Sequence, residues 1–228
     1  MHKILAVLLY FSFISLGGCT NGKDTSENNT SEIESQANEI QENDQQKTLV
    51  FFGNSLTAGY GLDPEDAFPY LIEQKLDSLG KDYKVINAGL SGETTAAGLS
   101  RVDWILDQYD IDVFVLELGG NDGLRGIDLE ETKSNLEKII EKVRAEEDDV
   151  EIILAGMQIP PNMGPDYTSE FRNIFPEVAE DKDVSLIPFL LENVGGEKEL
   201  NLGDGIHPNE KGHKIVAENV WRVLKQSV

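Results

Sequence analysis

Short apolar runs alternate with longer segments of helical periodicity from Thr48 to the C-terminus, and this alternation limits the possible folds more than any other feature. The runs have the length of strands and are apolar throughout, which is typical of strands buried between two layers. Strands are predicted at residues 49–52, 84–87, 113–118, 152–155 and 185–187, and helices at 68–79, 96–108, 129–144, 171–180 and 210–225. This order predicts an α/β fold, a three-layer sandwich with a five-stranded parallel sheet.

Small polar residues and glycine follow the first three predicted strands. Ser55 comes just after the first strand, Gly89 after the second and Asn121 after the third. The carboxyl ends of parallel strands meet at one edge of the sheet, where open α/β sheets place their ligands. We therefore expect these three residues to converge at that edge.

The histidines are few enough to narrow the choice of a catalytic base. The chain has three, and His2 lies in a leader that we expect to be removed. His213 stands among lysines in a segment of helical spacing, which predicts a solvated position on a helix face. His207 follows a Gly-Asp-Gly turn and precedes Pro208, which suits the first position of a helix. The alternative role for His207 is a cap on that helix. Asp204 can reach the ring Nδ1 and fix the tautomer of the imidazole, and since a helix cap needs no such partner, this favours a catalytic role.

Four short blocks occur in order along the chain. They are Gly53-Asn54-Ser55-Leu56, Asn87-Ala88-Gly89 with Ser91-Gly92, Gly119-Gly120-Asn121-Asp122, and Asp204-x-x-His207. Together they resemble the blocks of the GDSL, or SGNH, hydrolases, and residues 117–126 are especially similar to the bacterial thioesterase/lysophospholipase/arylesterase branch. The resemblance implies a flavodoxin-like topology and a serine ester hydrolase acting on acyl esters or lysophospholipids.

The resemblance also implies a role for each residue of the blocks. Ser55 would be the nucleophile, His207 its base and Asp204 the group that orients the imidazole. The N–H groups of Ser55 and Gly89 and the side chain of Asn121 would bind the oxyanion. A carbohydrate O-deacetylase on the same scaffold and a non-catalytic surface binding module are the alternatives.

Asn54 departs from the commonest form of the first block, which has aspartate at this position. In the family that aspartate is not the triad acid but orders the loop by hydrogen bonds. Asparagine keeps an acceptor oxygen and adds a donor, so we expect activity to survive.

Composition argues against several other classes of protein. The net charge of −23 argues against nucleic acid as a partner, and the single cysteine excludes an intrachain disulfide. Two histidines in the mature chain, without metal-ligand spacing, predict no catalytic metal. The glycine-rich residues 119–123 lack the lysine of a P-loop and the order of a dinucleotide site, and no cofactor is expected.

The N-terminus is typical of an exported lipoprotein. Residues 1–18 are predicted to be a signal peptide, and Leu16-Gly17-Gly18-Cys19 resembles a lipobox with Cys19 as the lipidated residue. Residues 19–46 are predicted to be a disordered acidic linker and residues 47–228 the catalytic domain. We expect the protein in the bacterial cell envelope, anchored to the membrane by lipid and located in the outer membrane or facing the periplasm.

Apolar residues in the loops after the third and fourth predicted strands suggest where an acyl chain would bind. They are Leu124, Ile127, Met157, Ile159, Pro160, Pro161, Met163 and Tyr167. Ordinary loop packing is the alternative. At the carboxyl edge of the sheet they would line a groove leading away from Ser55, and methionine suits a flexible acyl chain.

Overall fold

The computed structural model describes residues 46–228, and these residues form an α/β fold around one parallel sheet. The strands are β1 (Lys47–Gly53), β2 (Tyr83–Gly89), β3 (Val113–Glu117), β4 (Glu151–Ala155) and β5 (Ser185–Ile187). Their order in the sheet is β2-β1-β3-β4-β5, and every neighbouring pair is parallel. The predicted strands are confirmed, and this strand order is that of flavodoxin-like folds.

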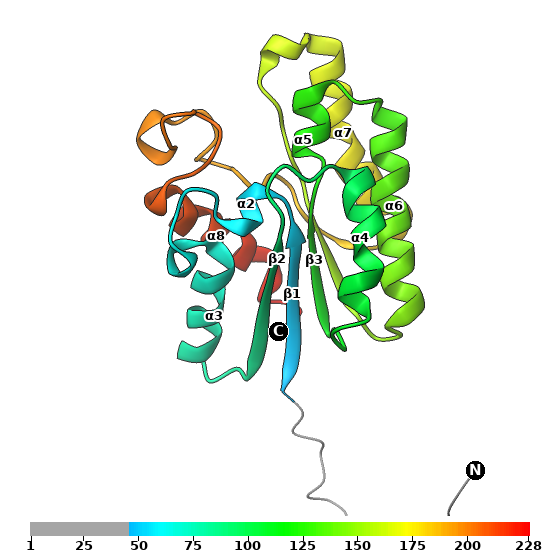
Figure 1. Ribbon diagram of the computed structural model, residues 1–228, viewed down its shortest axis with the longest axis vertical. Helices are drawn as coiled ribbons and strands as arrows, with labels where there is room; N and C mark the ends of the chain where they lie inside the picture. The colour runs from blue at the N-terminus through cyan, green and yellow to red at the C-terminus, as the bar shows by residue number, and fades with distance from the viewer. Residues whose placement is uncertain (1–45) are drawn as a thin grey trace, which may run out of the picture. The chain divides into compact units, whose positions relative to one another are not determined.

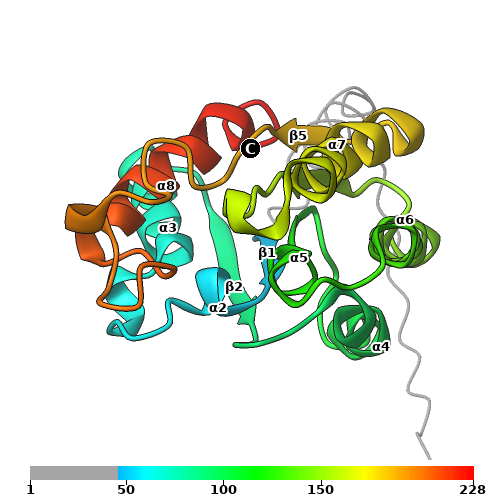
Figure 2. The same cartoon turned by 90° about the horizontal axis from the view of Figure 1, so that it is seen from above.

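Helices cover both faces of the sheet (Figures 1 and 2). On one face lie α3 (Phe68–Ser78) and α8 (Glu210–Leu224), and on the other lie α4 (Thr95–Leu106), α6 (Leu129–Glu146) and α7 (Pro165–Lys182). The three predicted layers are therefore confirmed. Helix α7 begins six residues before its prediction, because its first turns are not buried and carry no apolar pattern.

Several short elements escaped prediction because they contain too few residues to show a periodicity. They are the helices α2 (Ser55–Ala58) and α5 (Gly120–Arg125) and the 3₁₀ turns η1 (Pro64–Asp66), η2 (Pro161–Met163) and η3 (Lys198–Leu200). Helices α2 and α5 directly follow β1 and β3. They carry Ser55 and Asn121 at the carboxyl edge of the sheet, and Gly89 ends β2 at the same edge.

The core explains why β1 is apolar without alternation. Phe51 packs edge-on against Phe68 of α3, with ring centroids 5.3 Å apart. Phe52, on the opposite face, stacks on Phe114 of β3 at 5.5 Å. Each fully buried phenylalanine contributes roughly 1.5–3 kcal/mol relative to an exposed one. Because both faces of β1 are buried, both alternating sets of side chains are hydrophobic.

His213 lies on the buried face of α8, and its predicted solvated position is wrong. Its side chain is buried, and Nδ1 accepts the backbone N–H of Phe68 at 3.1 Å. The imidazole thus satisfies one of the free N–H groups at the start of α3, where Ala67 offers no side-chain cap. Burial, with a smaller contribution from His207, lowers the pKa of His213 to about 4. This histidine is neutral near pH 7 and has a structural role.

The predicted signal peptide, Cys19 and all of the predicted linker except Gln46 lie outside the described residues. Within residues 46–228, no helix is long and apolar enough to cross a membrane.

Candidate active site

Ser55 is held at a sharp junction between β1 and α2. Asn54 caps α2, since its Oδ1 accepts the N–H of Leu56 at 3.0 Å. A Cβ on Gly53 would overlap Thr57 Oγ1 and come within 2.7 Å of Glu117 Oε2, so only glycine fits where the chain leaves the strand. Ser55 is the first residue of α2, and its backbone N–H makes no hydrogen bond within residues 46–228.

The histidine and aspartate from the C-terminal block meet Ser55 in a continuous hydrogen-bonded chain. His207 Nε2 lies 2.9 Å from Ser55 Oγ, although 152 residues separate them in the sequence. His207 Nδ1 lies 2.7 Å from Asp204 Oδ2. The three residues are thus within hydrogen-bonding distance, the arrangement needed to remove a proton from the serine hydroxyl.

Asp204 is fixed as an anion by the turn that it forms. Its Oδ1 accepts the backbone N–H groups of Ile206 at 2.9 Å and His207 at 3.0 Å, while Gly205 takes a positive φ of 72°. The hydrogen bonds from the backbone of His207, the backbone of Ile206 and the His207 ring lower the pKa of Asp204 to about 2. An ionised Asp204 favours the tautomer with a proton on His207 Nδ1, which leaves Nε2 free to accept from Ser55.

Helix α8 is capped by Asn209 and not by His207. Asn209 Oδ1 accepts the N–H groups of Lys211 at 3.0 Å and Gly212 at 3.1 Å. Because α8 begins at Glu210, Pro208 precedes the cap and does not occupy the first helical position as predicted. The capping alternative for His207 is therefore excluded.

Tyr60 is a neighbour of the triad that sequence reasoning missed. Its ring lies 4.5 Å from the His207 ring, tilted by 38°, while more than half of the residue remains exposed. The contact restricts the imidazole only through packing, since no hydrogen bond joins the two rings. Nothing in the sequence near Tyr60 signals this contact.

The prediction for Gly89 as an oxyanion donor needs correction. Its N–H already donates to Asn87 Oδ1 at 3.0 Å. A Cβ at this position would overlap the backbone of Ala58, so glycine is required for the close approach of β2 to α2. Gly89 therefore has a packing role.

Gly92, three residues further on, has the free N–H that Gly89 lacks. It takes a positive φ of 84°, and its N–H makes no hydrogen bond within the described residues. The next carbonyl, that of Glu93, accepts one Nδ2–H of Asn121 at 2.9 Å, which places Gly92 beside Asn121. Arg125 holds the same loop by donating to the Gly92 carbonyl at 3.0 Å. The second Nδ2–H of Asn121 remains available.

An apolar cavity of about 450 Å³ adjoins Ser55 and His207. Five of the predicted groove residues line it, namely Leu124, Met157, Ile159, Pro160 and Pro161. The cavity is also lined by apolar residues that were not predicted, namely Leu56, Phe189, Leu191 and Ile206. Ile127, Met163 and Tyr167 do not line it, and the Tyr167 hydroxyl instead donates to the Ile127 carbonyl at 2.9 Å.

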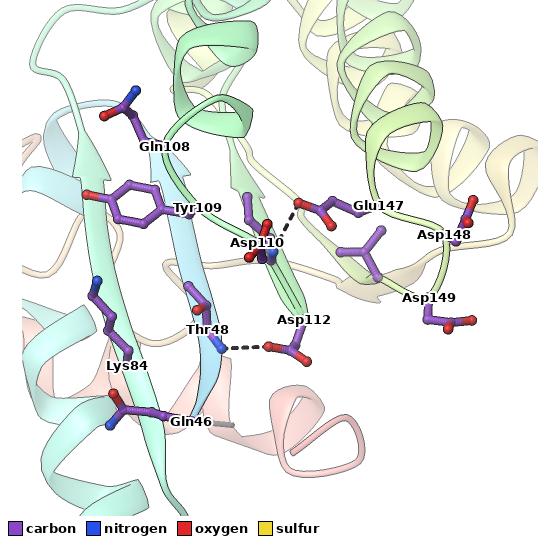
Figure 3. A pocket seen from close by; sticks show the side chains of 12 residues that line it. Gln46, Thr48, Lys84, Gln108, Tyr109, Asp110, Asp112, Glu147, Asp148 and Asp149 are labelled. Carbon is purple, nitrogen blue, oxygen red and sulfur yellow. Dashed lines mark hydrogen bonds between the residues drawn. The ribbon is translucent and has the colours of Figure 1, made fainter. Parts of the chain in front are cut away.

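A second hollow, of about 500 Å³, lies at the amino ends of the strands, away from Ser55 (Figure 3). Five carboxylates line it, and two of them accept hydrogen bonds from backbone N–H groups at this edge of the sheet. Asp112 accepts the N–H of Thr48 at 2.7 Å and Glu147 that of Ile111 at 3.1 Å. It holds no nucleophile with a base, and no group within residues 46–228 has the arrangement to hold a metal ion. The candidate active site is therefore the one at the carboxyl edge of the sheet, beside Ser55 and His207.

A serine facing an aspartate-bound imidazole, at the carboxyl edge of a flavodoxin-like sheet, defines a serine hydrolase. Residues 51–215 match the GDSL-like Lipase/Acylhydrolase family, and the chain belongs to this family. It is a carboxylic ester hydrolase of the SGNH type.

Several bacterial proteins are similar over most of the domain. Esterase TesA of Pseudomonas aeruginosa is 40% identical over 179 residues, covering 78% of this chain and 88% of the relative. Thioesterase 1/protease 1/lysophospholipase L1 of Escherichia coli K12 is 37% identical, covering 79% and 85%. The crystal structure of TesA has a TM-score of 0.77 at 40% identity, covering 80% of this chain and 100% of that one. The esterase EstA from Pseudoalteromonas, inhibited by monoethylphosphonate, has a TM-score of 0.75 at 33% identity, covering 79% and 97%.

Proposed function

We propose that the protein cleaves acyl esters through an acyl-enzyme on Ser55, with His207 as base and Asp204 as the orienting group. The observation that carries the proposal is the 2.9 Å separation of Ser55 Oγ and His207 Nε2. Ser55 Oγ attacks the carbonyl carbon and its proton passes to Nε2, which then gives it to the departing alcohol oxygen. Water repeats the sequence, passing a proton to His207 and releasing the acid and free Ser55.

The charge that develops on the carbonyl oxygen needs fixed donors. We assign these to the N–H of Ser55, the N–H of Gly92 and the second Nδ2–H of Asn121. In support, none of the three has another acceptor within the described residues. The Ser55 N–H also lies at the N-terminus of α2, where the free N–H groups favour an anion.

The substrate class follows from the lining of the cavity beside Ser55. Leu124, Met157 and Ile159 offer an apolar, adaptable surface for an acyl chain. Relatives named arylesterase and thioesterase/lysophospholipase fit the same choice. We propose acyl esters and lysophospholipids as substrates.

Catalytic efficiency should rise from acetyl to medium-chain p-nitrophenyl esters. Each buried methylene is worth about 0.8 kcal/mol when fully desolvated, so even partial burial should raise kcat/KM several-fold over a few carbons. Lysophospholipid should release fatty acid at a measurable rate. Leu124→Ser should flatten the chain-length dependence, while Leu79→Ser, at an exposed leucine at the end of α3, should leave it unchanged.

The deacetylase alternative predicts the opposite dependence of catalytic efficiency on acyl-chain length. Fastest turnover on acetyl esters, with acetylated oligosaccharide preferred over longer acyl esters, would establish it. A non-catalytic binding module would hydrolyse none of these substrates.

We also propose that the protein is exported and anchored through a lipid on Cys19. The support is the Leu16-Gly17-Gly18-Cys19 sequence after an apolar leader. Residues 19–46 would act as a tether and residues 47–228 as the catalytic domain, in the cell envelope. Several acyl chains together anchor firmly where one would be marginal.

Cys19→Ser should move the protein from the membrane fraction to the soluble fraction, because the lipid attachment point is lost. Hydrolysis of soluble esters should be unchanged, since the tether contributes no catalytic group. Mass spectrometry of the mature N-terminus provides the direct check. An unmodified N-terminus at a residue other than Cys19 would refute the anchor.

A further inference from the structure

A buried carboxylate lies directly beneath the nucleophile turn. Glu117, the last residue of β3, is only 1% exposed. Its Oε2 accepts the N–H of Asn54 at 3.1 Å and the hydroxyl of Thr57 at 2.8 Å. Its Oε1 accepts the side-chain Nδ2–H of Asn54 at 2.8 Å. One carboxylate thus ties together the residues on both sides of Ser55.

These hydrogen bonds come from neutral groups. Burial raises the pKa of Glu117 to about 7, against the hydrogen bonds from Thr57 and Asn54, which lower it. Helix α2 has no titratable side chain, and those of α5 bond elsewhere, Asp122 to Thr95 and Arg125 to the Gly92 carbonyl. Lys47 and Glu151, the titratable side chains of β1 and β4, begin their strands at the opposite end from Glu117. Glu117 Oε1 therefore depends on the side-chain amide of Asn54 for its hydrogen bond, and the chemical group at position 54 determines whether this oxygen is bonded.

We propose that Asn54 is a positioning residue, whose neutral amide lets Glu117 remain ionised and hold the Ser55 turn in place at alkaline pH. The proposal rests on the proposed role of Ser55 as nucleophile. An aspartate at position 54, common in the first block of the family, would set two carboxylates against each other at hydrogen-bonding distance. Such a pair can stay together only by sharing a proton.

The second contact of Asn54 allows its two roles to be separated. Its Oδ1 caps α2 through the N–H of Leu56, and an aspartate oxygen would keep that bond. The same Oδ1 lies 3.4 Å from Ser55 Oγ, a contact that an aspartate oxygen would also keep. Asn54→Asp therefore preserves the shape of the side chain, the cap and the contact with Ser55, and it replaces the amide that donates to Glu117 by a second carboxylate oxygen. A loss that appears only at alkaline pH cannot come from the cap.

The test is the pH dependence of kcat on a soluble ester for wild type, Asn54→Asp and Asn54→Asp/Glu117→Gln. Wild type should reach a plateau and keep it on the alkaline side. Asn54→Asp should lose activity by about tenfold or more above roughly pH 8, as the shared proton leaves and two anions repel. The double variant should recover the plateau, because its glutamine amide can donate to the introduced aspartate and only one carboxylate of the pair remains.

Two results would overturn the proposal. An Asn54→Asp profile parallel to wild type at alkaline pH would reduce Asn54 to a cap. A double variant as impaired as Asn54→Asp would show that the carboxylate pair is not the cause, and this comparison holds even if Asn54→Asp folds poorly. Labelling of wild-type Ser55 by a fluorophosphonate at neutral pH keeps the two proposals apart. If Ser55 is labelled but Asn54→Asp shows no loss of activity at alkaline pH, only the proposed role of Asn54 is refuted. If Ser55 is not labelled, its assignment as the nucleophile is refuted.

Discussion

Ser55→Ala and His207→Ala should each lower kcat by on the order of 10⁴-fold or more, with the fold intact. The serine hydroxyl is a poor nucleophile until a positioned base takes its proton, and either change removes one half of that pair. The double variant should be little worse than either single one, because the two groups act as a unit. Steady-state hydrolysis of a p-nitrophenyl ester, with thermal unfolding as the check on folding, measures all three.

Ser100→Ala is the matched control for the loss of a serine hydroxyl. Ser100 is exposed on α4, where its hydroxyl donates to the Ala96 carbonyl within the same helix. Its replacement should leave kcat unchanged. Activity of Ser55→Ala equal to that of Ser100→Ala would end the assignment of the nucleophile.

Asn121→Ala should lower kcat by about 10²–10³-fold with little change in KM. The lost Nδ2–H is proposed to meet charge that exists only in the transition state, so ground-state binding is spared. Asn121→Asp keeps the size of the side chain but places an acceptor where a donor is needed. Asn121→Asp should lower kcat at least as much as Asn121→Ala does. Because aspartate fills the same space as asparagine, this result would assign the loss to the missing donor and not to lost packing. Asn121→Ala within about threefold of wild type would remove Asn121 from the oxyanion site.

The arrangement of the sheet could be predicted from the sequence because it depends on local patterns. Apolar runs buried on both faces identify the strands, and parallel strands bring Ser55 and Asn121 to one edge without knowledge of any contact. The pairing of Asp204 with His207 was equally local, since three residues separate them. The structure places Ser55 Oγ against the same ring.

The buried position of His213 could also have been read from the sequence. It shares a helix face with Val216, Ala217 and Val220, which lie three, four and seven residues further on and are all buried. The neighbouring lysines suggested solvent, but on a helix adjacent residues point in different directions. Periodicity was therefore the better signal.

Other features depend on contacts between distant segments and carry no local signal. The choice between Gly89 and Gly92 as oxyanion donor turns on which N–H is already bonded, and only the fold gives Gly89 its bond to Asn87. Glu117 is a polar residue near the end of a predicted strand, yet it is buried and accepts hydrogen bonds from Asn54 and Thr57, which lie 63 and 60 positions earlier. Phe189 joins the cavity in the same way, from a loop after β5.

Labelling of the full-length wild-type protein with a fluorophosphonate, followed by peptide mass mapping, tests the central claim most directly. The reagent phosphonylates a serine hydroxyl only when a base activates it. We predict a single modified residue, Ser55, with loss of esterase activity in proportion to labelling, and much slower labelling of His207→Ala. Full esterase activity with Ser55 unmodified, or labelling of a different serine that tracks the loss of activity, would contradict the assignment of Ser55 as the nucleophile.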